Sequence, residues 1–264
     1  MVYAAILAGG VGKRMNGGKL PKQFLPLGNL SILEYSTLCF LENPSVDKVF
    51  VAVPKEWITY TEDLLLGKGG MSGTRAGVAI VQGGANAEAS SESGEHRVSG
   101  VCTGVAIVQG GVDRNSSLMA VVNKINELYG IKNDDIIITH DAVRPFVTRQ
   151  IIDENIETCR KYGAAATAII LSDTPIISDD GETIVDIPVR SSYYAAQTPQ
   201  TFNMHLLQEV YVSLSDEEKE LLTDAGKMFV LRNKKVGLVN GASFNIKITT
   251  PFDYTIACAY ISNK

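Results

Sequence analysis

The stretch that decides the fold class of this chain is Val2-Tyr-Ala-Ala-Ile-Leu-Ala-Gly-Gly-Val-Gly-Lys-Arg-Met15. Its first six residues, Val2–Leu7, form a short apolar run typical of a buried strand, and glycines follow almost directly. Four further runs of this kind are found at Lys48–Val53, Val105–Val108, Asp135–Thr139 and Ala164–Leu171. Helix-length segments lie between them at Ser31–Leu41, Lys55–Leu66, Ser116–Leu128 and Arg149–Tyr162. This alternation predicts an α/β fold with a mainly parallel sheet and helices on both faces.

In a sheet of this type, ligands bind beyond the carboxyl ends of the strands, at the point where the strand order reverses. Functional residues are therefore expected in the loops that directly follow strands. One helical segment also shows how it packs, because it carries an apolar face with spacings of three and four residues. The residues of this face are Leu118, Val121, Val122, Ile125 and Leu128.

Length and composition indicate an ordinary globular protein with a small excess of negative charge. The 264 residues are 45% hydrophobic and 20% charged, and a chain of this size buries a core without disulfides. The net charge of −5 argues against a duplex-DNA binder and leaves room for a local basic pocket. Four widely spaced cysteines (Cys39, Cys102, Cys159, Cys258) and the lack of a long apolar N-terminal segment favour a cytoplasmic protein with reduced thiols.

Residues 67–103 break the strand–helix rhythm and are rich in Gly, Ser, Ala and Glu. Within them Gly77-Val-Ala-Ile-Val-Gln-Gly-Gly84 is found, and the same eight residues recur as Gly104–Gly111. Two copies are too few for a solenoid. We interpret the pair as a local duplication with one working strand and one exposed copy. The expected organisation is a single domain over 1–264 with a flexible insertion at 67–103.

A second break, at 172–194, carries the turn signals Ser172-Asp-Thr-Pro175 and Asp179-Asp-Gly181 between short β-prone runs. This pattern predicts a protruding β arm. Exposed arms of this kind often form dimer contacts, so we expect 172–194 to serve in dimerisation.

The glycines after the first strand are predicted to bind a phosphate, because they let backbone N–H groups approach an anion closely. Two common nucleotide motifs fail here. Met15 stands where the dinucleotide fingerprint needs a third glycine, and Arg14 follows Lys13 where a P-loop needs Ser or Thr. The cations Arg14, Lys19 and Lys22 favour phosphate over the alternative, a tight turn with a solvated basic rim.

Lys22 lies between Pro21 and an apolar segment, where it is either held in place or an ordinary surface lysine. A stronger signal is His140-Asp-Ala-Val-Arg-Pro145, which puts an acid and an arginine at the end of a strand. Asp141 there suits Mg²⁺ bound together with substrate phosphates. The alternative is a salt bridge between Asp141 and Arg144 within a turn. His140 is interpreted as a structural residue.

Two later segments complete the set of candidate sites. Gly110-Gly-Val-Asp-Arg-Asn-Ser-Ser117 opens a helix, and amides of a glycine turn at a helix N-terminus favour anions or carbonyl acceptors. Ser117 is alternatively a capping hydroxyl. Phe244-Asn-Ile-Lys-Ile-Thr-Thr-Pro251 places Lys247 in an expected apolar strand, where a cation needs a partner that a phosphate would provide.

Taken together, six ordered segments resemble the cytidylyltransferases that act on sugar-alcohol phosphates. They are Leu7-Ala-Gly-Gly-Val-Gly-Lys-Arg-Met15, Pro21-Lys-Gln-Phe-Leu25, Gly110-Gly-Val-Asp-Arg114, His140-Asp-Ala-Val-Arg-Pro145, Gln197-Thr-Pro-Gln-Thr-Phe202 and Asn245-Ile-Lys-Ile-Thr-Thr-Pro251. The resemblance covers nearly the whole chain except about residues 67–103. It implies a Rossmann-like nucleotidyltransferase fold.

The family has two close branches, and the resemblance is stronger to one of them. One branch makes CDP-ribitol from D-ribitol 5-phosphate for teichoic-acid-type cell-wall polymers, and the other makes CDP-methylerythritol for isoprenoids. The segments that resemble the ribitol branch are Leu7–Gly10, Val143-Arg-Pro-Phe146, Gln197–Phe202 and Leu214-Ser-Asp-Glu-Glu-Lys-Glu-Leu-Leu-Thr-Asp224. D-ribitol 5-phosphate is therefore the expected acceptor, and 2-C-methyl-D-erythritol 4-phosphate is the alternative.

The resemblance also implies a mechanism and roles for individual residues. The acceptor phosphate attacks the α-phosphorus of CTP in line and pyrophosphate leaves with Mg²⁺, so positioning and charge stabilisation dominate. Catalytic roles fall to Arg14, Lys22, Arg190 and Lys247. The nucleotide would be held by Leu7, Ala8, Gly9, Gly10, Gly12, Gly111, Arg114, Ser117 and Ala142. The acceptor would be held by Asp141, Arg144, Thr174, Arg190, Thr198 and Lys247, and Asp141 would also hold Mg²⁺.

In the family, the residues that match Thr174 and Arg190 come from the arm of the neighbouring subunit, which implies a homodimer with shared sites. The departure from the family is the 67–103 insertion, which enters just before the base-binding loop. Only the second repeat copy is followed by Arg114 and Ser117, so we assign that loop to it. The insertion leaves a second hypothesis, a catalytically weakened nucleotide-binding homologue.

Overall fold

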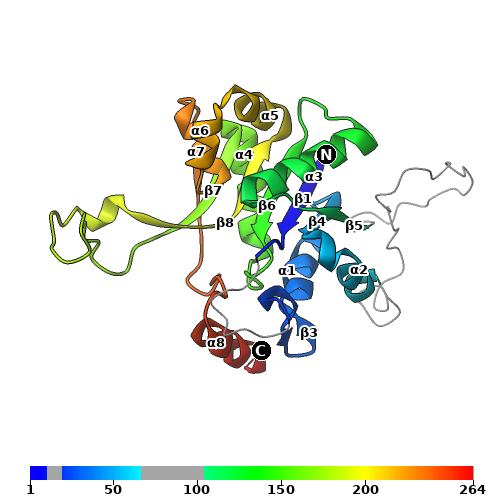
Figure 1. The fold of residues 1–264 in the computed structure, drawn as a ribbon, viewed down its shortest axis with the longest axis horizontal. Coiled ribbons are helices and arrows are strands. Elements are labelled where there is room, and N and C mark those ends of the chain that lie inside the picture. The colour runs from blue at the N-terminus through cyan, green and yellow to red at the C-terminus, as the bar shows by residue number, and fades with distance from the viewer. Residues whose placement is uncertain (11–19, 67–103, 264) are drawn as a thin grey trace, which may run out of the picture.

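The computed structural model describes residues 1–10, 20–66 and 104–263, with a seven-stranded sheet at the centre (Figure 1). The strand order is β5-β4-β1-β6-β8-β7-β9. The bounds are β1 Val2–Leu7, β4 Lys48–Val53, β5 Val105–Gln109, β6 Ile136–Asp141, β7 Ala164–Ile170, β8 Tyr194–Asn203 and β9 Gly237–Asn240. β1 pairs in parallel with β4 and β6, β4 with β5, and β7 with β9, whereas β8 runs antiparallel to β6 and β7. The predicted α/β fold with a mainly parallel sheet is confirmed.

Helices pack on both faces of the sheet, as predicted. One face carries α1 (Ile32–Leu41), α2 (Ile58–Leu66) and α4 (Arg149–Tyr162). The other carries α3 (Arg114–Tyr129), α5 (Met204–Ser213) and α7 (Ala225–Leu231), with the short α6 (Asp216–Glu220) between the last two in sequence. The apolar face of α3 packs against the sheet, because Leu118, Val121, Val122 and Ile125 are fully buried.

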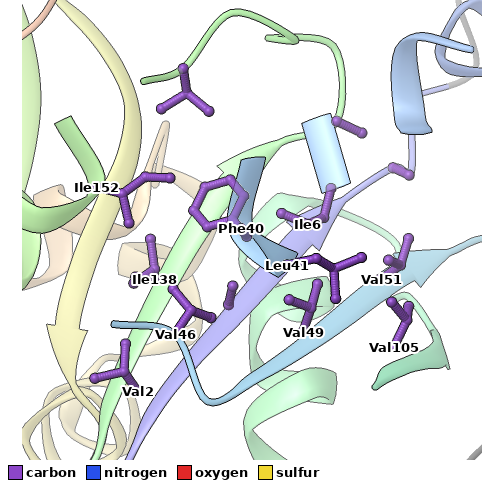
Figure 2. Packing of buried hydrophobic residues seen from close by; sticks show 14 of the residues in the cluster. Val2, Ile6, Phe40, Leu41, Val46, Val49, Val51, Val105, Ile138 and Ile152 are labelled. Carbon is purple, nitrogen blue, oxygen red and sulfur yellow. The ribbon is translucent and has the colours of Figure 1, made fainter. Parts of the chain in front are cut away.

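Alternate side chains of β1 point to opposite faces of the sheet, so the strand contributes to the hydrophobic cores on both faces. Val2 and Ile6 belong to the cluster on the α1 face, and Tyr3 and Ala5 belong to the cluster on the α3 face. Figure 2 shows the first cluster, in which Phe40 lies over the strands between Ile6 and Ile152. Because helices cover both faces of the sheet, the sequence of β1 is apolar at every position.

Most predicted elements begin and end within two residues of their observed bounds, since apolar runs and caps specify them. α1 starts after Ser31, whose hydroxyl accepts from the backbone N–H of Glu34 in a capping box. α3 begins at Arg114, two residues earlier than predicted, because Asp113 is its N-cap and accepts from the Ser116 N–H. The expected helix over Lys55–Leu66 divides into a 3₁₀ turn, Lys55–Trp57, and α2. The second repeat copy forms β5, whereas the first copy and Cys102 lie outside the described residues.

The segment between β7 and β8 extends away from the body of the molecule (Figure 1). Its expected β character is slight, because the segment contains one isolated bridge, between Ile177 and Asp186, and a 3₁₀ turn at Arg190–Ser192. Its apolar side chains remain exposed, as at Val189, which is 72% accessible.

A third, smaller core lies beside the sheet and involves the C-terminal helix α8 (Pro251–Ser262). It joins α8 to the hairpin β2 (Pro26–Leu27) and β3 (Leu30–Ser31) and to the start of α1 through Leu27, Ile32 and Ala257. Val143 and Ile248 belong to the same core, so it fixes the loops that follow β6 and precede α8. None of the helices in the described ranges is long and apolar enough to cross a membrane.

Candidate active site

The site lies where the strand order reverses, between β1 and β6. From β1 the chain continues to β4 and β5 on one side and then returns to β6 on the other. Leu7 and Asp141 are register partners at the carboxyl ends of these two strands, and the Ala142 N–H donates to the Leu7 carbonyl at 3.1 Å. The Ala142 carbonyl in turn accepts from the Ser36 hydroxyl at 2.8 Å. The loops after β1 and β6 are therefore fixed against each other at the place where such sheets bind ligands.

Two glycine turns meet at this edge, with the Ser117 hydroxyl between them. Ser117 Oγ accepts from the Gly111 N–H at 3.0 Å and donates to the Asp113 carbonyl at 2.7 Å. A Cβ atom on Gly110 would lie 3.0 Å from Ser117 Oγ, and one on Gly9 would lie 4.0 Å from it. Because Ser117 is the fourth residue of α3, its hydroxyl closes the glycine turn instead of capping the helix.

Lys22 lies next to the first glycine turn, on the 3₁₀ turn Lys22–Phe24. A Cβ atom on Gly10 would lie 3.9 Å from Lys22 Cε. The neighbouring Gln23 is buried and its amide donates to the Ala8 carbonyl at 2.7 Å. Lys22 is thus half-buried and anchored, which favours the interpretation that it is held in place over an ordinary surface lysine.

Three cations converge on the carboxylate of Asp141. Lys247 Nζ lies 2.9 Å from Oδ2, Arg114 Nε 3.3 Å from Oδ1 and Arg144 Nε 3.6 Å from Oδ2. These contacts join the loop after β6, the start of α3 and the segment before α8. The turn salt bridge between Asp141 and Arg144, which is the alternative to a magnesium site, therefore exists and is one of three such pairs.

Electrostatics keep the Asp141 carboxylate ionised. Burial alone would raise its pKa, but the charges of Arg114 and Lys247, the hydrogen bond from Lys247 and the charge of Arg144 outweigh burial and hold the pKa well below its usual range. With three cations around one carboxylate, positive charge remains in excess at the site. The two terminal nitrogens of Arg114 are buried and make no hydrogen bond among the described residues. Unpaired buried donors of this kind are costly without an acceptor, and phosphate oxygens are good acceptors for guanidinium groups.

His140 is a buried structural residue, as predicted. Its Nε2 lies 2.9 Å from the Arg144 carbonyl, which can only accept, so Nε2 carries the proton. Nδ1 then accepts from the Thr198 hydroxyl at 3.1 Å, and that hydroxyl accepts from the Asp141 N–H at 3.1 Å. Burial lowers the pKa of His140 to about 4, which matches this neutral arrangement. The Thr198 hydroxyl is consequently committed to neighbours inside the protein, beside the carboxylate of Asp141.

Lys247 stands on an extended loop, so the expected strand over Phe244–Pro251 is wrong. Asn245 and Ile248 are the buried positions there, and they are three residues apart instead of two. Lys247 has a partner within the chain, the carboxylate of Asp141, where the sequence predicts a phosphate. A phosphate that approaches would meet a lysine already aimed at the site.

Several predicted site residues are not brought to this place within one chain. Thr174 and Arg190 are exposed on the arm, where the Arg190 guanidinium donates to the Ser172 carbonyl at 3.0 Å. Gly12 and Arg14 lie outside the described residues.

Two buried amides that support the site were missed from the sequence: Gln23, beside Lys22, and Asn245, two residues before Lys247. A polar residue next to an apolar position and close to an expected cation is the signal that marks both of them.

The described residues of the candidate site could contribute one carboxylate to a divalent cation, but they form no complete metal site by themselves. Among the described residues, no three His, Cys, Asp or Glu side chains form a group that could hold a metal ion. A magnesium ion carried by a triphosphate needs only one or two protein carboxylates, and the ionised Asp141 is one at the right strand end.

Comparison with known proteins agrees with this fold. The family model for 2-C-methyl-D-erythritol 4-phosphate cytidylyltransferase (IspD) matches residues 2–101 and 90–263. The first repeat copy lies within the first match and the second copy within the second match, as expected for a duplicated segment.

Solved structures are similar over nearly their whole length. The 4-diphosphocytidyl-2C-methyl-D-erythritol synthase of Anaerococcus prevotii is 24% identical, with a TM-score of 0.70 over 99% of this chain and 98% of that one. The 2-C-methyl-D-erythritol 4-phosphate cytidylyltransferase of Francisella tularensis is 25% identical, with a TM-score of 0.69 over 97% of each chain. The enzyme of that name from Thermus thermophilus is 22% identical, with a TM-score of 0.65 over 99% and 100%. With a family model that spans almost all of its length and a glycine-rich cationic site at the expected strand ends, the chain belongs to the IspD cytidylyltransferase family and is a CTP-dependent nucleotidyltransferase.

Proposed function

We propose that this chain transfers the cytidylyl group of CTP to the phosphate of a polyol phosphate, with D-ribitol 5-phosphate as the acceptor. An oxygen of the acceptor phosphate attacks the α-phosphorus of CTP, the bond from that phosphorus to the bridging oxygen breaks, and pyrophosphate leaves with the electron pair. The products are CDP-ribitol, a precursor of teichoic-acid-type polymers, and pyrophosphate.

The observation that carries the transfer chemistry is the convergence of Lys247, Arg114 and Arg144 on Asp141 at the ends of β1 and β6. Excess positive charge held in place beforehand stabilises a transition state whose charge spreads over phosphate oxygens. Lys22, beside Gly10, would meet the phosphates of CTP, and the resemblance assigns Arg14, which lies outside the described residues, to the same phosphates. The two glycine turns and Ser117 would hold the cytidine, in keeping with their close approach.

The choice of acceptor depends on sequence segments, and a second candidate has its own support. Val143-Arg-Pro-Phe146 and Gln197–Phe202 favour D-ribitol 5-phosphate by resemblance. Val143 and Phe146 are buried in the third core, so their support for the ribitol branch comes from the resemblance and not from a contact with the acceptor. The family model and the similar solved structures carry the name of the methylerythritol enzyme, and they favour 2-C-methyl-D-erythritol 4-phosphate.

A divalent cation, Mg²⁺, is part of the proposal as a companion of CTP. When bound it would neutralise charge on the triphosphate and the leaving pyrophosphate. Asp141 is the carboxylate of this site placed to approach it, and the ionised state of Asp141 supports that role.

The proposed enzyme is a homodimer in which the arms are exchanged, and we place it in the cytoplasm. Support for the dimer comes from the arm, where Ile184, Val185 and Ile187 are all more than half exposed around a single β-bridge. Arm exchange would bring Thr174 and Arg190 to the partner's Lys247.

The test of the shared site is complementation between two variants, Arg190→Ala and Lys247→Ala, each of which should be inactive alone. After random re-association about a quarter of the native activity should return, because half of the dimers then hold one intact site of two. Failure of mixed dimers to regain activity would count against shared sites.

The experiment that tests the acceptor is a comparison of kcat/KM for D-ribitol 5-phosphate and 2-C-methyl-D-erythritol 4-phosphate with CTP and Mg²⁺. A preference of at least about 100-fold for ribitol phosphate is expected, which equals about 2.7 kcal/mol of discrimination. The reverse preference would assign the chain to the methylerythritol branch. CTP binding without turnover of either compound would favour the weakened homologue.

A further inference from the structure

Asn245 is a fully buried amide on which three separate parts of the chain meet. Its Nδ2 donates to the Thr198 carbonyl at 2.9 Å and to Gln197 Oε1 at 3.2 Å, both in β8. Its own backbone carbonyl accepts from Arg144 Nη1 at 2.8 Å, from the loop after β6. Asn245 itself lies on the loop that carries Lys247, two residues further along.

The orientation of this amide is set by its partners. The Thr198 carbonyl can only accept, so the NH₂ group of Asn245 must face it. Gln197 is oriented in the same way, because its Nε2 donates to the Ala242 carbonyl and leaves Oε1 for Asn245 and the Ala242 N–H. The arrangement therefore ties both ends of the short segment from Ala242 to Asn245 to β8.

From these contacts we infer that Asn245 is a positioning residue for cytidylyl transfer, which holds the loop of Lys247 on β8 and on the Asp141–Arg144 loop. The inference rests on the proposed function in one respect, that Lys247 meets the acceptor phosphate. Asn245 touches no reacting atom in this arrangement and acts through Lys247.

The physical argument is that the backbone at Lys247 is held through the contacts of the residues on either side of it, which include the hydrogen bonds from the Thr249 N–H and hydroxyl to Asp253 Oδ2 at 2.8 Å. The loop is not a strand, and the side chain of Lys247 is 43% exposed. Directly after Lys247 in the sequence, the Ile248 N–H donates to the Val143 carbonyl at 2.9 Å and the Ile248 side chain packs in the third core. Asn245 supplies the corresponding anchor before Lys247 in the sequence. A displacement of about 1 Å at a positioning group lowers rates by about 100-fold in enzymes that work by alignment.

The test is Asn245→Asp, which keeps the shape and places a carboxylate oxygen against the two acceptors of β8. The matched control is Asn43→Asp. Asn43 is equally buried, and its Nδ2 donates to Asp153 Oδ1 at 3.0 Å. It precedes β4 and so lies near the amino end of that strand, away from the candidate site at the carboxyl ends. Both variants lose an amide donor that faces an acceptor, so both lose stability. Asn245→Ser provides a milder change in case Asn245→Asp does not fold.

Kinetics should separate the two sites. For Asn245→Asp and, less strongly, Asn245→Ser, kcat/KM for the acceptor should fall about 30-fold or more, while the Kd for CTP stays within about twofold. Asn43→Asp should change neither quantity by more than about twofold. In a Lys247→Ala background, the further loss from Asn245→Asp should shrink below about threefold, because the residue through which it acts is gone.

A second readout does not depend on the acceptor. Hydrogen exchange of the Ile248 amide should accelerate at least about tenfold in Asn245→Asp and remain unchanged in Asn43→Asp. Equal exchange in the two variants, or a full-size kinetic loss in the Lys247→Ala background, would overturn the inference. If the native chain turns over neither acceptor, the proposed function fails, and the exchange rates still decide whether Asn245 anchors the loop.

Discussion

Replacement of Asp141 with asparagine removes one negative charge from among three cations and keeps the shape of the side chain. The carboxylate is almost buried, and Lys247, Arg114 and Arg144 lie within 2.9–3.6 Å of its oxygens. Loss of one partner from a buried ion pair costs about 3–5 kcal/mol, because the remaining charges are left uncompensated. Lys247 is partly exposed and screened by solvent, so we take the lower end, about 3 kcal/mol. For a domain of this size that loss corresponds to a fall in Tm of about 6–12 °C.

The assay is thermal and urea unfolding at pH 7.5, with Asp135→Asn as the matched control. Asp135 is buried just before the opposite end of the same strand, where it accepts from the N-terminal ammonium at 2.5 Å and from the Lys132 N–H at 2.9 Å. Both variants should lose stability, but only Asp141→Asn should lose cytidylyl transfer, by about 100-fold or more. The native pKa of Asp141 is depressed, so its contribution is complete above the unfolded pKa of about 3.9 and declines as the pH falls below that value.

Inorganic phosphate provides the decisive comparison. In Asp141→Asn three cations lack their counter-charge, so phosphate should raise the Tm of this variant more than that of the native chain or of Asp135→Asn. Equal stabilisation of all three proteins by phosphate, or an Asp141→Asn variant as stable as the native chain, would refute the electrostatic reasoning.

The same geometry makes three further predictions. Below pH about 6.5 the unfolded chain binds a proton at His140, whereas the folded protein keeps this side chain neutral down to its lowered pKa of about 4. The free energy of unfolding should therefore fall by about 3 kcal/mol between pH 7 and pH 4 in the native chain, and His140→Gln should lack this dependence. The same pH dependence in the urea unfolding of the two proteins would contradict the assignment of His140 as buried and neutral. Lys22→Ala should lower kcat about 10²–10³-fold in a pyrophosphate-release assay, and near-normal turnover would remove Lys22 from the mechanism. Gly111→Ala should disrupt the start of α3, because its Cβ would lie 2.4 Å from Ser116 Oγ, whereas Gly10→Ala, whose Cβ would meet no atom of the described residues closer than 3.9 Å, should have the same Tm as the native chain; equal stability of both variants would count against a tight turn at Gly111.

The strands β1, β4, β5, β6 and β7 were predictable because buried strands and capped helices leave local signals, whereas the short parallel strand β9 (Gly237–Asn240) was not predicted. Val2–Leu7 and Lys48–Val53 are continuous apolar runs, and their observed bounds match the prediction. β8 left no such signal. It runs antiparallel between β6 and β7, and its residues Gln197, Thr198 and Pro199 are polar or lack an N–H donor, which argues against a strand. α8 was also missed, since its apolar residues are spread around the helix without a clear face.

The candidate site was predictable as a set of positions and not as a network. Glycine turns and charged residues after strands could be recognised from local sequence. The pairing of Lys247 with Asp141 joins residues far apart in the chain, and it depends on how the third core packs the loop before α8 against the loop after β6. The role of Asn245 was invisible for the same reason, because its partners lie in a strand that the sequence did not reveal.

The most direct test of cytidylyl transfer at this site is ³¹P NMR of CTP and Mg²⁺ with the native chain, before and after addition of D-ribitol 5-phosphate in which the phosphate carries ¹⁸O. We expect acceptor-dependent release of unlabelled pyrophosphate and a new diphosphate signal that retains the label, because an acceptor oxygen attacks the α-phosphorus. Label in the pyrophosphate, or pyrophosphate release at the same rate without an acceptor, would contradict transfer by this route.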